Sequence, residues 1–271
     1  MSIPAFRFAP SPNGELHMGH AYSALLNARM AAEAGGRFLV RIEDIDTLRC
    51  TPALADKALS DHAWLGLTWE QPVRFQSEHL DDYRRQQQRL RAMGLLYPCF
   101  CSRKESAASS PSARRDPEDQ PLYAGTCRKL AAEAVSRRVA AGEPHALRLD
   151  MRMASDDPAA LAWGDVVIVR RDIGTSYHIA VVTDDHLQGI THVVRGRDLE
   201  AATAIHLTLQ RLLGFAAPRY HHHKLIGDEA GRKLSKSEGA KSLRALRASG
   251  VTAADVRKAL GFERVDERSS D

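Results

Sequence analysis

The chain has 271 residues, enough for one large domain or two modest ones with a buried core. Hydrophobic residues make up 44% and charged residues 27%, which is typical of a globular enzyme and excludes a chain disordered throughout. No run approaches the roughly 20 apolar residues that cross a bilayer, and the amino terminus lacks the apolar run of a secretory signal. Four cysteines are too few for a disulfide framework, so we expect a cytoplasmic protein without a membrane partner.

The formal net charge is +4, but the positive charge is unevenly distributed. Residues 224–264 hold ten Lys or Arg and five Asp or Glu. A local surplus of this kind suits a polyanion, but it is also common on a solvated helical face. Charge alone therefore does not decide between these two interpretations.

The start of the chain has the pattern of a strand, a helix and a second strand. A short strand is predicted over residues 5–9, where Pro10 and Pro12 end it. A helix is predicted over residues 16–34 and a second strand over residues 37–45, with the sequence RFLVRIEDI. A strand, helix and strand of this length favour parallel pairing.

The rest of the chain alternates between helical and strand-like patterns, interrupted by a polar segment rich in Ser and Pro within residues 99–128. We find no internal repeat of the kind that indicates a solenoid. The predicted helices cover residues 52–65, 78–93, 129–141 and 199–213, with further helix after residue 241. The predicted strands cover residues 145–151, 165–171, 179–182 and 191–195.

A histidine pair lies where the first strand leads into the first helix. The segment FAPSPNGELHMGH contains His17, Gly19 and His20 at the predicted helix start. Backbone amides at a helix start favour anions, and a glycine lets a phosphate chain approach the main chain. These features indicate a nucleotide site, although an isolated pair of histidines is more often surface decoration.

A second basic motif, KLSKS, lies between two glycines near the end of the chain. It contains Lys233, Ser235, Lys236 and Ser237. Such a loop could close over a triphosphate and neutralise the charge that develops as pyrophosphate leaves. By itself the motif is more often a basic surface turn. The two motifs together, in this order, carry more weight than either alone.

The two motifs resemble the HIGH and KMSKS signatures, and GITHVVRGRDL lies between them. The set is similar to class I aminoacyl-tRNA synthetases of the glutamyl and glutaminyl branch, over residues 7–240. The resemblance implies an α/β fold with a Rossmann-type (class I synthetase) catalytic domain formed by residues 1–95 and 180–240. It further implies an inserted, zinc-bearing, acceptor-end-like domain at residues 96–179 that contacts tRNA, and a short helical C-terminal segment at residues 241–271 that contacts an RNA stem.

The resemblance implies a ligase that uses ATP and Mg²⁺ to activate an amino acid as its adenylate. His17, His20 and Lys236 are then the catalytic residues, because they would stabilise the transition state at the α-phosphate. The implied ATP-binding residues are His17, Gly19, His20, Lys233, Ser235, Lys236 and Ser237.

Glutamate offers one ammonium and two carboxylates, so its pocket should present an acid and two arginines. Arg7, Glu43 and Arg195 meet this demand, with Glu43 on the ammonium and the arginines on the carboxylates. An ion pair between Arg7 and Glu43 is the structural alternative, and Asp44 and Asp46 compete for the role of Glu43. The resemblance completes the expected glutamate-binding set, which is Arg7, Phe8, Ala9, Pro10, Ser11, Glu43, Tyr177 and Arg195.

Three cysteines bracket the polar segment. Cys99, Cys101 and Cys127 could place three thiolates around a tetrahedral metal such as zinc, and the phenolate oxygen of Tyr123 could complete the site. The resemblance supports this interpretation, because small glutamyl-type synthetases without an anticodon domain carry a Cys-x-Cys and Tyr-x-x-x-Cys pattern as a structural zinc site.

Other histidines and the fourth cysteine have weaker claims on a metal. His145 and His178 are the alternatives for the fourth ligand. Cys50 lies in a different segment, so we expect it to be buried or incidental. The run of three histidines at residues 221–223 precedes the KLSKS motif, and we expect a strand there that is solvated or near ATP rather than a metal site.

Only 34 residues follow Ser237, too few for an anticodon-binding domain. This architecture resembles synthetases that activate glutamate without tRNA and transfer it to the queuosine base at the wobble position of tRNA(Asp). The expected partners are therefore ATP, L-glutamate and queuosine-containing tRNA(Asp), and the expected state is a monomer. The alternatives are a truncated glutamyl-tRNA synthetase that charges a tRNA 3′ end, a related nucleotidyltransferase, and a non-catalytic RNA-binding paralogue. No G-x-G-x-x-G follows the first strand, which argues against a dehydrogenase.

Overall fold

The computed structural model describes residues 3–110, 114–226 and 241–262. Contacts along the chain divide it into two compact units. Unit 1 holds the described residues within 1–77, 190–198 and 218–271, and unit 2 holds those within 78–189 and 199–217. The boundaries expected for an inserted domain at residues 96–179 stay a prediction. Within the described ranges, no helix has both the length and the apolar character needed to cross a membrane.

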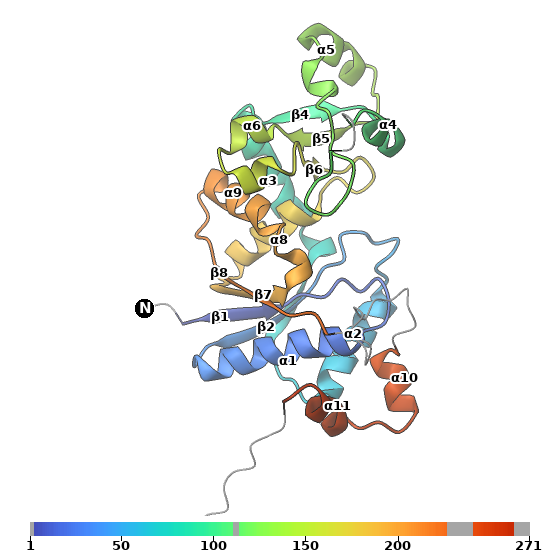
Figure 1. The fold of residues 1–271 in the computed structure, drawn as a ribbon, viewed down its shortest axis with the longest axis vertical. Helices are drawn as coiled ribbons and strands as arrows, with labels where there is room; N and C mark the ends of the chain where they lie inside the picture. Colours follow the sequence, from blue (N-terminus) through green and yellow to red (C-terminus); the bar gives the residue numbers. More distant parts are fainter. Residues whose placement is uncertain (1–2, 111–113, 227–240, 263–271) are drawn as a thin grey trace, which may run out of the picture. The chain divides into compact units, whose positions relative to one another are not determined.

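Unit 1 is built on a parallel sheet of five strands in the order β3-β2-β1-β7-β8 (Figure 1). The strands are β1 (Ala5–Phe8), β2 (Arg37–Ile42), β3 (Glu70–Phe75), β7 (His192–Gly196) and β8 (Arg219–His223). The chain passes from β1 to its neighbour β2, while β7 pairs with the other side of β1, so the strand order reverses at β1. Ligands of open parallel sheets bind outside the carboxyl ends of the strands at such a point. The predicted Rossmann-like parallel sheet is confirmed.

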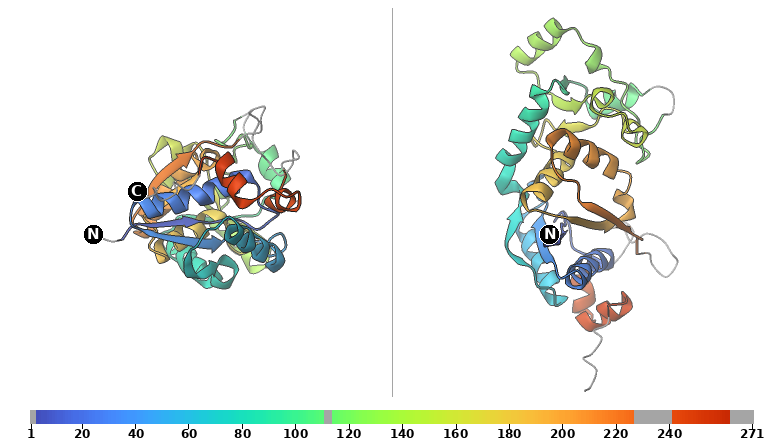
Figure 2. Two further views of the ribbon diagram at one scale, coloured as in Figure 1. Left: turned by 90° about the horizontal axis from the view of Figure 1, so that it is seen from below. Right: turned by 90° about the vertical axis from the view of Figure 1, so that its left-hand side faces the viewer.

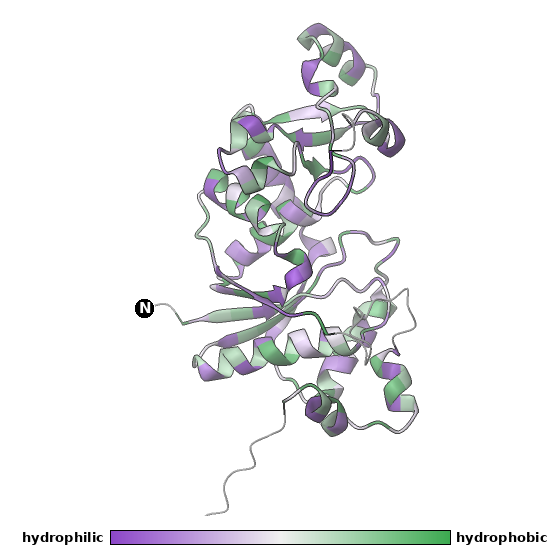
Figure 3. Cartoon of the chain, viewed as in Figure 1, coloured by the Kyte–Doolittle hydropathy of each residue, from purple (hydrophilic) through white to green (hydrophobic). Residues whose placement is uncertain are grey.

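Helix α1 (Met18–Glu33) covers one face of this sheet, and Figure 3 shows hydrophobic residues along much of it. Because side chains alternate along a strand, Phe6 and Phe8 of β1 both face α1 and join its apolar residues in one buried cluster. Asn27 is fully buried in α1, and its Nδ2 donates to the Val194 carbonyl oxygen of β7 at 3.0 Å. This bond ties the helix to the strand beside the reversal point.

Three further helices complete the described part of unit 1. Helix α2 (Pro52–Trp64) begins with a Thr51 side-chain cap and a proline in its first turn, as helix starts often do. Helices α10 (Leu243–Ala248) and α11 (Ala253–Ala259) lie beside α1 in Figure 2 and add apolar residues to the same buried cluster. A 3₁₀ turn, η1 (Gln76–His79), follows β3.

Unit 2 combines a small antiparallel sheet with helices. Its strands are β4 (Leu96–Cys99), β5 (Ala146–Leu149) and β6 (Val167–Val169), in that order. Its longer helices α3 (Leu80–Ala92), α8 (Tyr177–Leu187) and α9 (Thr203–Leu213) contribute to one apolar cluster. The shorter elements are α4 (Arg103–Ala108), η2 (Cys127–Lys129), α5 (Ala132–Ala140), α6 (Met151–Ala154), α7 (Pro158–Leu161) and η3 (Arg197–Leu199), whose last residue falls in unit 2.

The strand predicted over residues 179–182 is wrong, because these residues lie inside helix α8. Residues 179–182 are all apolar and all buried, so this run has no polar residue that would reveal a helical period. A short apolar run without such a period cannot be distinguished from a buried strand. The neighbouring strand predicted over residues 191–195 is confirmed as β7, while the exposed edge strand β3 was not anticipated.

His62 of α2 is fully buried beside Phe8, and this burial lowers its pKa to about 4. The unfolded chain has an ordinary histidine pKa near 6.5, so it binds a proton between these values while the folded chain does not. The stability that depends on a neutral His62 is therefore fully present above about pH 6.5 and is lost as the pH falls toward 4. We expect a loss of about 3 kcal/mol from this group, measured by urea unfolding across that range.

The variant His62→Gln removes the titrating ring and should flatten this dependence on pH. A variant whose unfolding free energy falls as steeply as that of the wild type would show that other groups cause the acid sensitivity.

Candidate functional site

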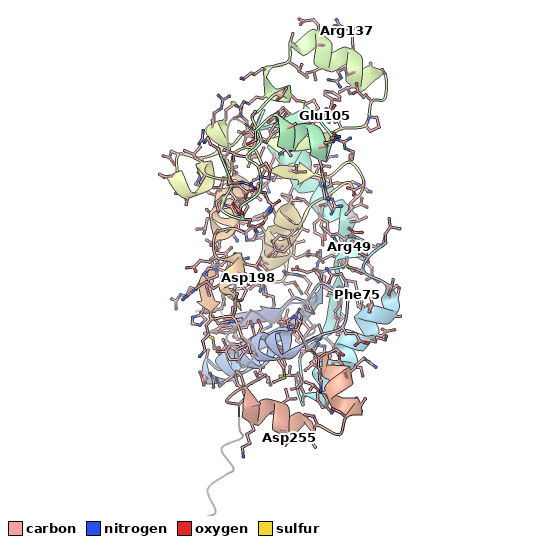
Figure 4. All side chains as sticks on the ribbon, turned by 45° about the vertical axis from the view of Figure 1, so that its right-hand side comes forward. Arg49, Phe75, Glu105, Arg137, Asp198 and Asp255 are labelled. Carbon is pink, nitrogen blue, oxygen red and sulfur yellow. The ribbon has the colours of Figure 1, made fainter. Side chains whose placement is uncertain are left out.

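The carboxyl ends of the parallel strands in unit 1 carry most of the predicted site. Figure 4 labels Phe75, the last residue of β3, and Asp198, which lies two residues after the end of β7. The segment after β1 leads to the histidine pair, and the segment after β2 contains Glu43. Residues far apart in the sequence therefore gather at one edge of the sheet.

Three buried arginines share the sheet face opposite α1. Strand register places Arg7 beside Leu39, so Arg7 and Arg41 project from the same face. The register between β1 and β7 adds Arg195 to that face. Their exposed fractions are 4% for Arg7, 0% for Arg41 and 5% for Arg195. Each is the second-last residue of its strand, so positive charge is concentrated at the carboxyl ends.

Glu43 follows β2 and is held at both its main chain and its side chain. Its amide donates to the Pro10 carbonyl oxygen at 3.0 Å, and Arg41 Nη2 donates to its Oε1 at 3.0 Å. Both side chains of this ion pair are buried, at 0% and 7% exposure. Sequence reasoning missed Arg41, although its position two residues before Glu43 on a strand places both on one face.

Asp44, an alternative to Glu43, is engaged by the main chain that follows β3. Ser77 donates from its amide to Asp44 Oδ1 at 2.9 Å and from its hydroxyl to Oδ2 at 2.7 Å. Both carboxylate oxygens therefore hold η1 in place. Asp44 therefore has a structural partner in the main chain, while Asp46 contributes its carbonyl oxygen to the turn ending at Cys50.

The histidine pair forms the amino-terminal cap of α1. His17 Nδ1 accepts from the Gly19 amide at 3.1 Å, and His20 Nδ1 accepts from the His17 amide at 3.2 Å. An acceptor nitrogen carries no proton, so each neutral ring carries its proton on Nε2. Both rings can therefore donate a hydrogen bond to an anion at the helix start. A Cβ at Gly19 would lie 3.0 Å from His17 Cε1, so glycine leaves room for the capping ring.

The KLSKS residues Lys233, Ser235, Lys236 and Ser237 lie outside the described residues. The described residues on either side of them bear on their prediction. Strand β8 ends at His223 beside the end of β7, and Ser242 forms an antiparallel bridge with His17. The amide of Leu243 donates to the Leu16 carbonyl oxygen at 2.8 Å. The chain therefore resumes after this segment directly beside the histidine pair.

The remaining predicted glutamate-binding residues differ in their surroundings. Phe8 packs in the core beneath α1, so any contact it makes with a ligand uses its main chain. Ala9, Pro10 and Ser11 follow β1 at the carboxyl edge of the sheet. Tyr177 begins α8 in unit 2, where its ring lies 5.5 Å from those of His178 and His206. The ligand-binding roles of these residues stay predictions.

The three cysteines predicted as metal ligands come together in unit 2. The sulfur atoms of Cys99, Cys101 and Cys127 all lie within 4.8 Å of one another, and the last two are 3.5 Å apart. The hydroxyl of Tyr123 lies 3.4 Å from Cys99 Sγ and 3.9 Å from Cys101 Sγ. The three cysteines could thus hold a metal ion, with the Tyr123 hydroxyl near two of them.

Local hydrogen bonds position these donors without an ion. The Phe100 amide donates to Cys127 Sγ at 3.4 Å, and the Cys127 amide donates to Tyr123 Oη at 2.8 Å. Burial raises the pKa of the Cys101 thiol to about 11. Burial also acts to raise the pKa of Cys127, but hydrogen bonds from Tyr123 and the Phe100 amide outweigh it and the pKa lies below its ordinary value.

Neither alternative metal ligand joins this cluster. His145 Nδ1 bonds the Glu143 carbonyl oxygen, and His178 Nδ1 lies 3.2 Å from His206 Nε2. Among the described residues, the three cysteines are the one group of at least three His, Cys, Asp or Glu that could hold a metal. Residues 221–223 form the end of β8, as expected of a strand, and Cys50 is buried.

Comparison with known proteins agrees with the geometry. The family model described as tRNA synthetases class I (E and Q), catalytic domain, matches residues 5–262. A glutamyl-Q tRNA(Asp) synthetase from Rhodobacter capsulatus is 48% identical, and the match covers 94% of this chain and 99% of that protein. A glutamyl-Q tRNA(Asp) synthetase from Symbiobacterium thermophilum is 41% identical over 91% of this chain and 82% of its own.

A solved structure supports the same fold. The glutamate-tRNA synthetase from Elizabethkingia anophelis matches with a TM-score of 0.76 at 29% identity. The match covers 88% of this chain and 53% of the synthetase, so this chain spans about half the length of that protein.

The cysteine cluster predicts that metal content depends on Cys101. We expect the purified protein to bind one metal ion per chain, and Cys101→Ser to lose most of it, because one ligand is removed. Since metal binding and folding are coupled, the melting temperature should fall by about 5 °C or more. Elemental analysis and thermal unfolding measure both effects.

Cys50→Ser is the matched control, because it removes a buried thiol outside the cluster. Equal metal content in the two variants would contradict a metal site at the cluster.

Proposed function

The chain belongs to the class I glutamyl- and glutaminyl-tRNA synthetase family and is therefore a ligase of the aminoacyl-tRNA synthetase type; from this premise we propose its reaction. The protein activates L-glutamate with ATP as glutamyl-adenylate, without tRNA, and transfers the glutamyl group to the queuosine base at the wobble position of tRNA(Asp). The name shared by the relatives from Rhodobacter capsulatus and Symbiobacterium thermophilum supports this choice of acceptor.

The observation that carries the activation step is the bridge between His17 and Ser242. It joins the chain just after the KLSKS motif to the cap of α1. Lys236 lies six residues before Ser242 in the sequence, so a short connection links the second motif to the first. Two motifs separated by more than two hundred residues can therefore act on one triphosphate.

In the proposed activation step, an oxygen of the glutamate α-carboxylate attacks the α-phosphorus of ATP, and the bond to the β-phosphate oxygen breaks. Pyrophosphate leaves and glutamyl-adenylate remains. His17 and His20 donate from Nε2 to phosphate oxygens, and Lys236 neutralises charge that develops as pyrophosphate departs. Bound Mg²⁺ would neutralise further charge on the phosphates. Lys233, Ser235 and Ser237 complete the contacts to ATP.

Glutamate recognition uses the charged edge of the sheet. Arg7 and Arg195 bind the two carboxylates, and Glu43 binds the ammonium. In the transfer step, a hydroxyl of the queuosine cyclopentene ring attacks the carbonyl carbon of the adenylate and AMP leaves. This step requires no nucleophilic side chain of the protein, so none is assigned.

The cysteine cluster is proposed to hold a structural zinc ion. A tetrahedral zinc with bonds of about 2.3 Å to sulfur separates its sulfur ligands by about 3.8 Å. The 3.5 Å between the Cys101 and Cys127 sulfur atoms supports this size of ion. Cys99, Cys101, Tyr123 and Cys127 would be its ligands, and no step of the reaction passes through it.

Lys236→Ala should slow formation of the adenylate about 100-fold, the typical loss when one transition-state donor is removed. Glutamate-dependent exchange between ATP and labelled pyrophosphate measures this step. Lys241→Ala is the matched control, because Lys241 is an exposed lysine close by in the sequence but outside the motif. Near-normal exchange by Lys236→Ala would remove this lysine from the mechanism.

The acceptor is tested by charging total tRNA, with and without queuosine, with labelled glutamate. We expect label only on tRNA that contains queuosine, and expect charging to persist when the 3′-terminal adenosine is removed beforehand. A second candidate is a truncated glutamyl-tRNA synthetase, which the match to the synthetase from Elizabethkingia anophelis favours. Charging that ignores queuosine and is abolished by removal of the 3′-terminal adenosine would support this candidate instead.

A further inference from the structure

The proposed function assigns a role to Glu43 but none to Arg41, its buried ion-pair partner. We propose that Arg41 is a positioning residue for glutamate recognition, whose buried guanidinium fixes the Glu43 carboxylate so that it accepts the α-ammonium of the ligand. This inference rests on the proposed function, because it takes glutamate as the ligand and Glu43 as its ammonium acceptor.

Arg41 is well placed for this role because it cannot easily move. It is the second-last residue of β2, a strand paired on both sides, and its side chain is completely buried. Its Nη2 donates to Glu43 Oε1 at 3.0 Å. The main chain of Glu43 is fixed separately, by the bond from its amide to Pro10 at 3.0 Å. The carboxylate is thus anchored at the end of an otherwise flexible side chain.

The chemistry of a carboxylate lets one group serve more than one partner. An ionised carboxylate has two oxygens with about four acceptor positions, so accepting from Arg41 at Oε1 is compatible with accepting from an ammonium as well. A glutamate side chain has three rotatable bonds and would otherwise sample several rotamers. If one rotamer is fixed in advance, the Glu43 side chain loses no further freedom when the ligand binds, and binding is stronger.

A purely structural role for Arg41 must be separated from this one. Removing one partner of a buried ion pair destabilises a fold, so lost activity alone would decide nothing. Glutarate provides the separation, because it has both carboxylates of glutamate but no ammonium. A residue that acts through Glu43 on the ammonium should affect glutamate and leave glutarate unaffected.

The experiment uses Arg41→Lys and Arg41→Met in glutamate-dependent exchange between ATP and pyrophosphate. We expect the KM for glutamate to rise about tenfold, the value of one charge-assisted hydrogen bond. The KM for ATP and the inhibition constant of glutarate should stay within about twofold of the wild type. Circular dichroism and the melting temperature show whether each variant is folded. If Arg41→Met does not fold, Arg41→Lys, which keeps the buried charge, provides the test.

Arg37→Met is the matched control. Arg37 lies on the same strand and has its own ion pair, from Nε to Glu70 Oε2 at 2.6 Å, but at the opposite end of the sheet. Its side chain is 40% exposed. We expect all three constants to remain at wild-type values in this variant.

A double variant tests whether Arg41 acts through Glu43. Adding Arg41→Met to Glu43→Gln should raise the KM for glutamate by less than twofold, because the interaction is already lost. A common rise of both KM values and the glutarate constant, or an unchanged KM for glutamate, would overturn the proposal. Wild-type exchange that does not depend on glutamate would instead overturn the proposed function, and the ligand named here with it.

Discussion

The parallel register of β1 between β2 and β7 is the constraint on which the rest of unit 1 depends. Along β1, Phe6 and Phe8 face α1, and Arg7 projects from the opposite face. A slip of one residue would move both aromatic rings to the face of the buried arginines and place a guanidinium in the apolar core. The same register places Arg41 and Arg195 near Arg7 on one face. One strand register therefore determines both the packing of the apolar core and the position of the arginines at the carboxyl edge of the sheet.

Buried arginines are tolerated only with partners, because an isolated charge in a protein interior costs several kcal/mol. The structure gives Arg41 a carboxylate partner and places the Arg195 guanidinium 5.2 Å from the Tyr220 ring centre. Such an edge is attractive to an anionic ligand. The cap of α1 adds a second anion site at the same edge, through backbone amides and histidine Nε2 protons. One edge of the sheet can thus serve both carboxylates and phosphates.

The sequence predicted the first strand, helix and strand well, because turn residues and glycines separate clearly different patterns there. It failed at residues 179–182, where complete burial removes the polar face that distinguishes a helix from a strand. The site motifs were recognisable because their residue types are unusual in close spacing. Arg41 was not, because an arginine on a strand usually lies at the surface, and only the three-dimensional register shows that this one is buried beside Glu43.

The cysteine cluster lies beside short strands and a helix without buried residues. Strands β4, β5 and β6 have only three or four residues each, and α5 has no buried residue. Arg137 is exposed on that helix, while the Arg138 guanidinium lies 3.9 Å from the ring centre of Phe100, between two of the cysteines. Without a buried residue, α5 gains little stability from apolar burial. A metal that joins residues 99 and 101 to residue 127 would supply the missing cross-link, and through Phe100 it would also steady α5.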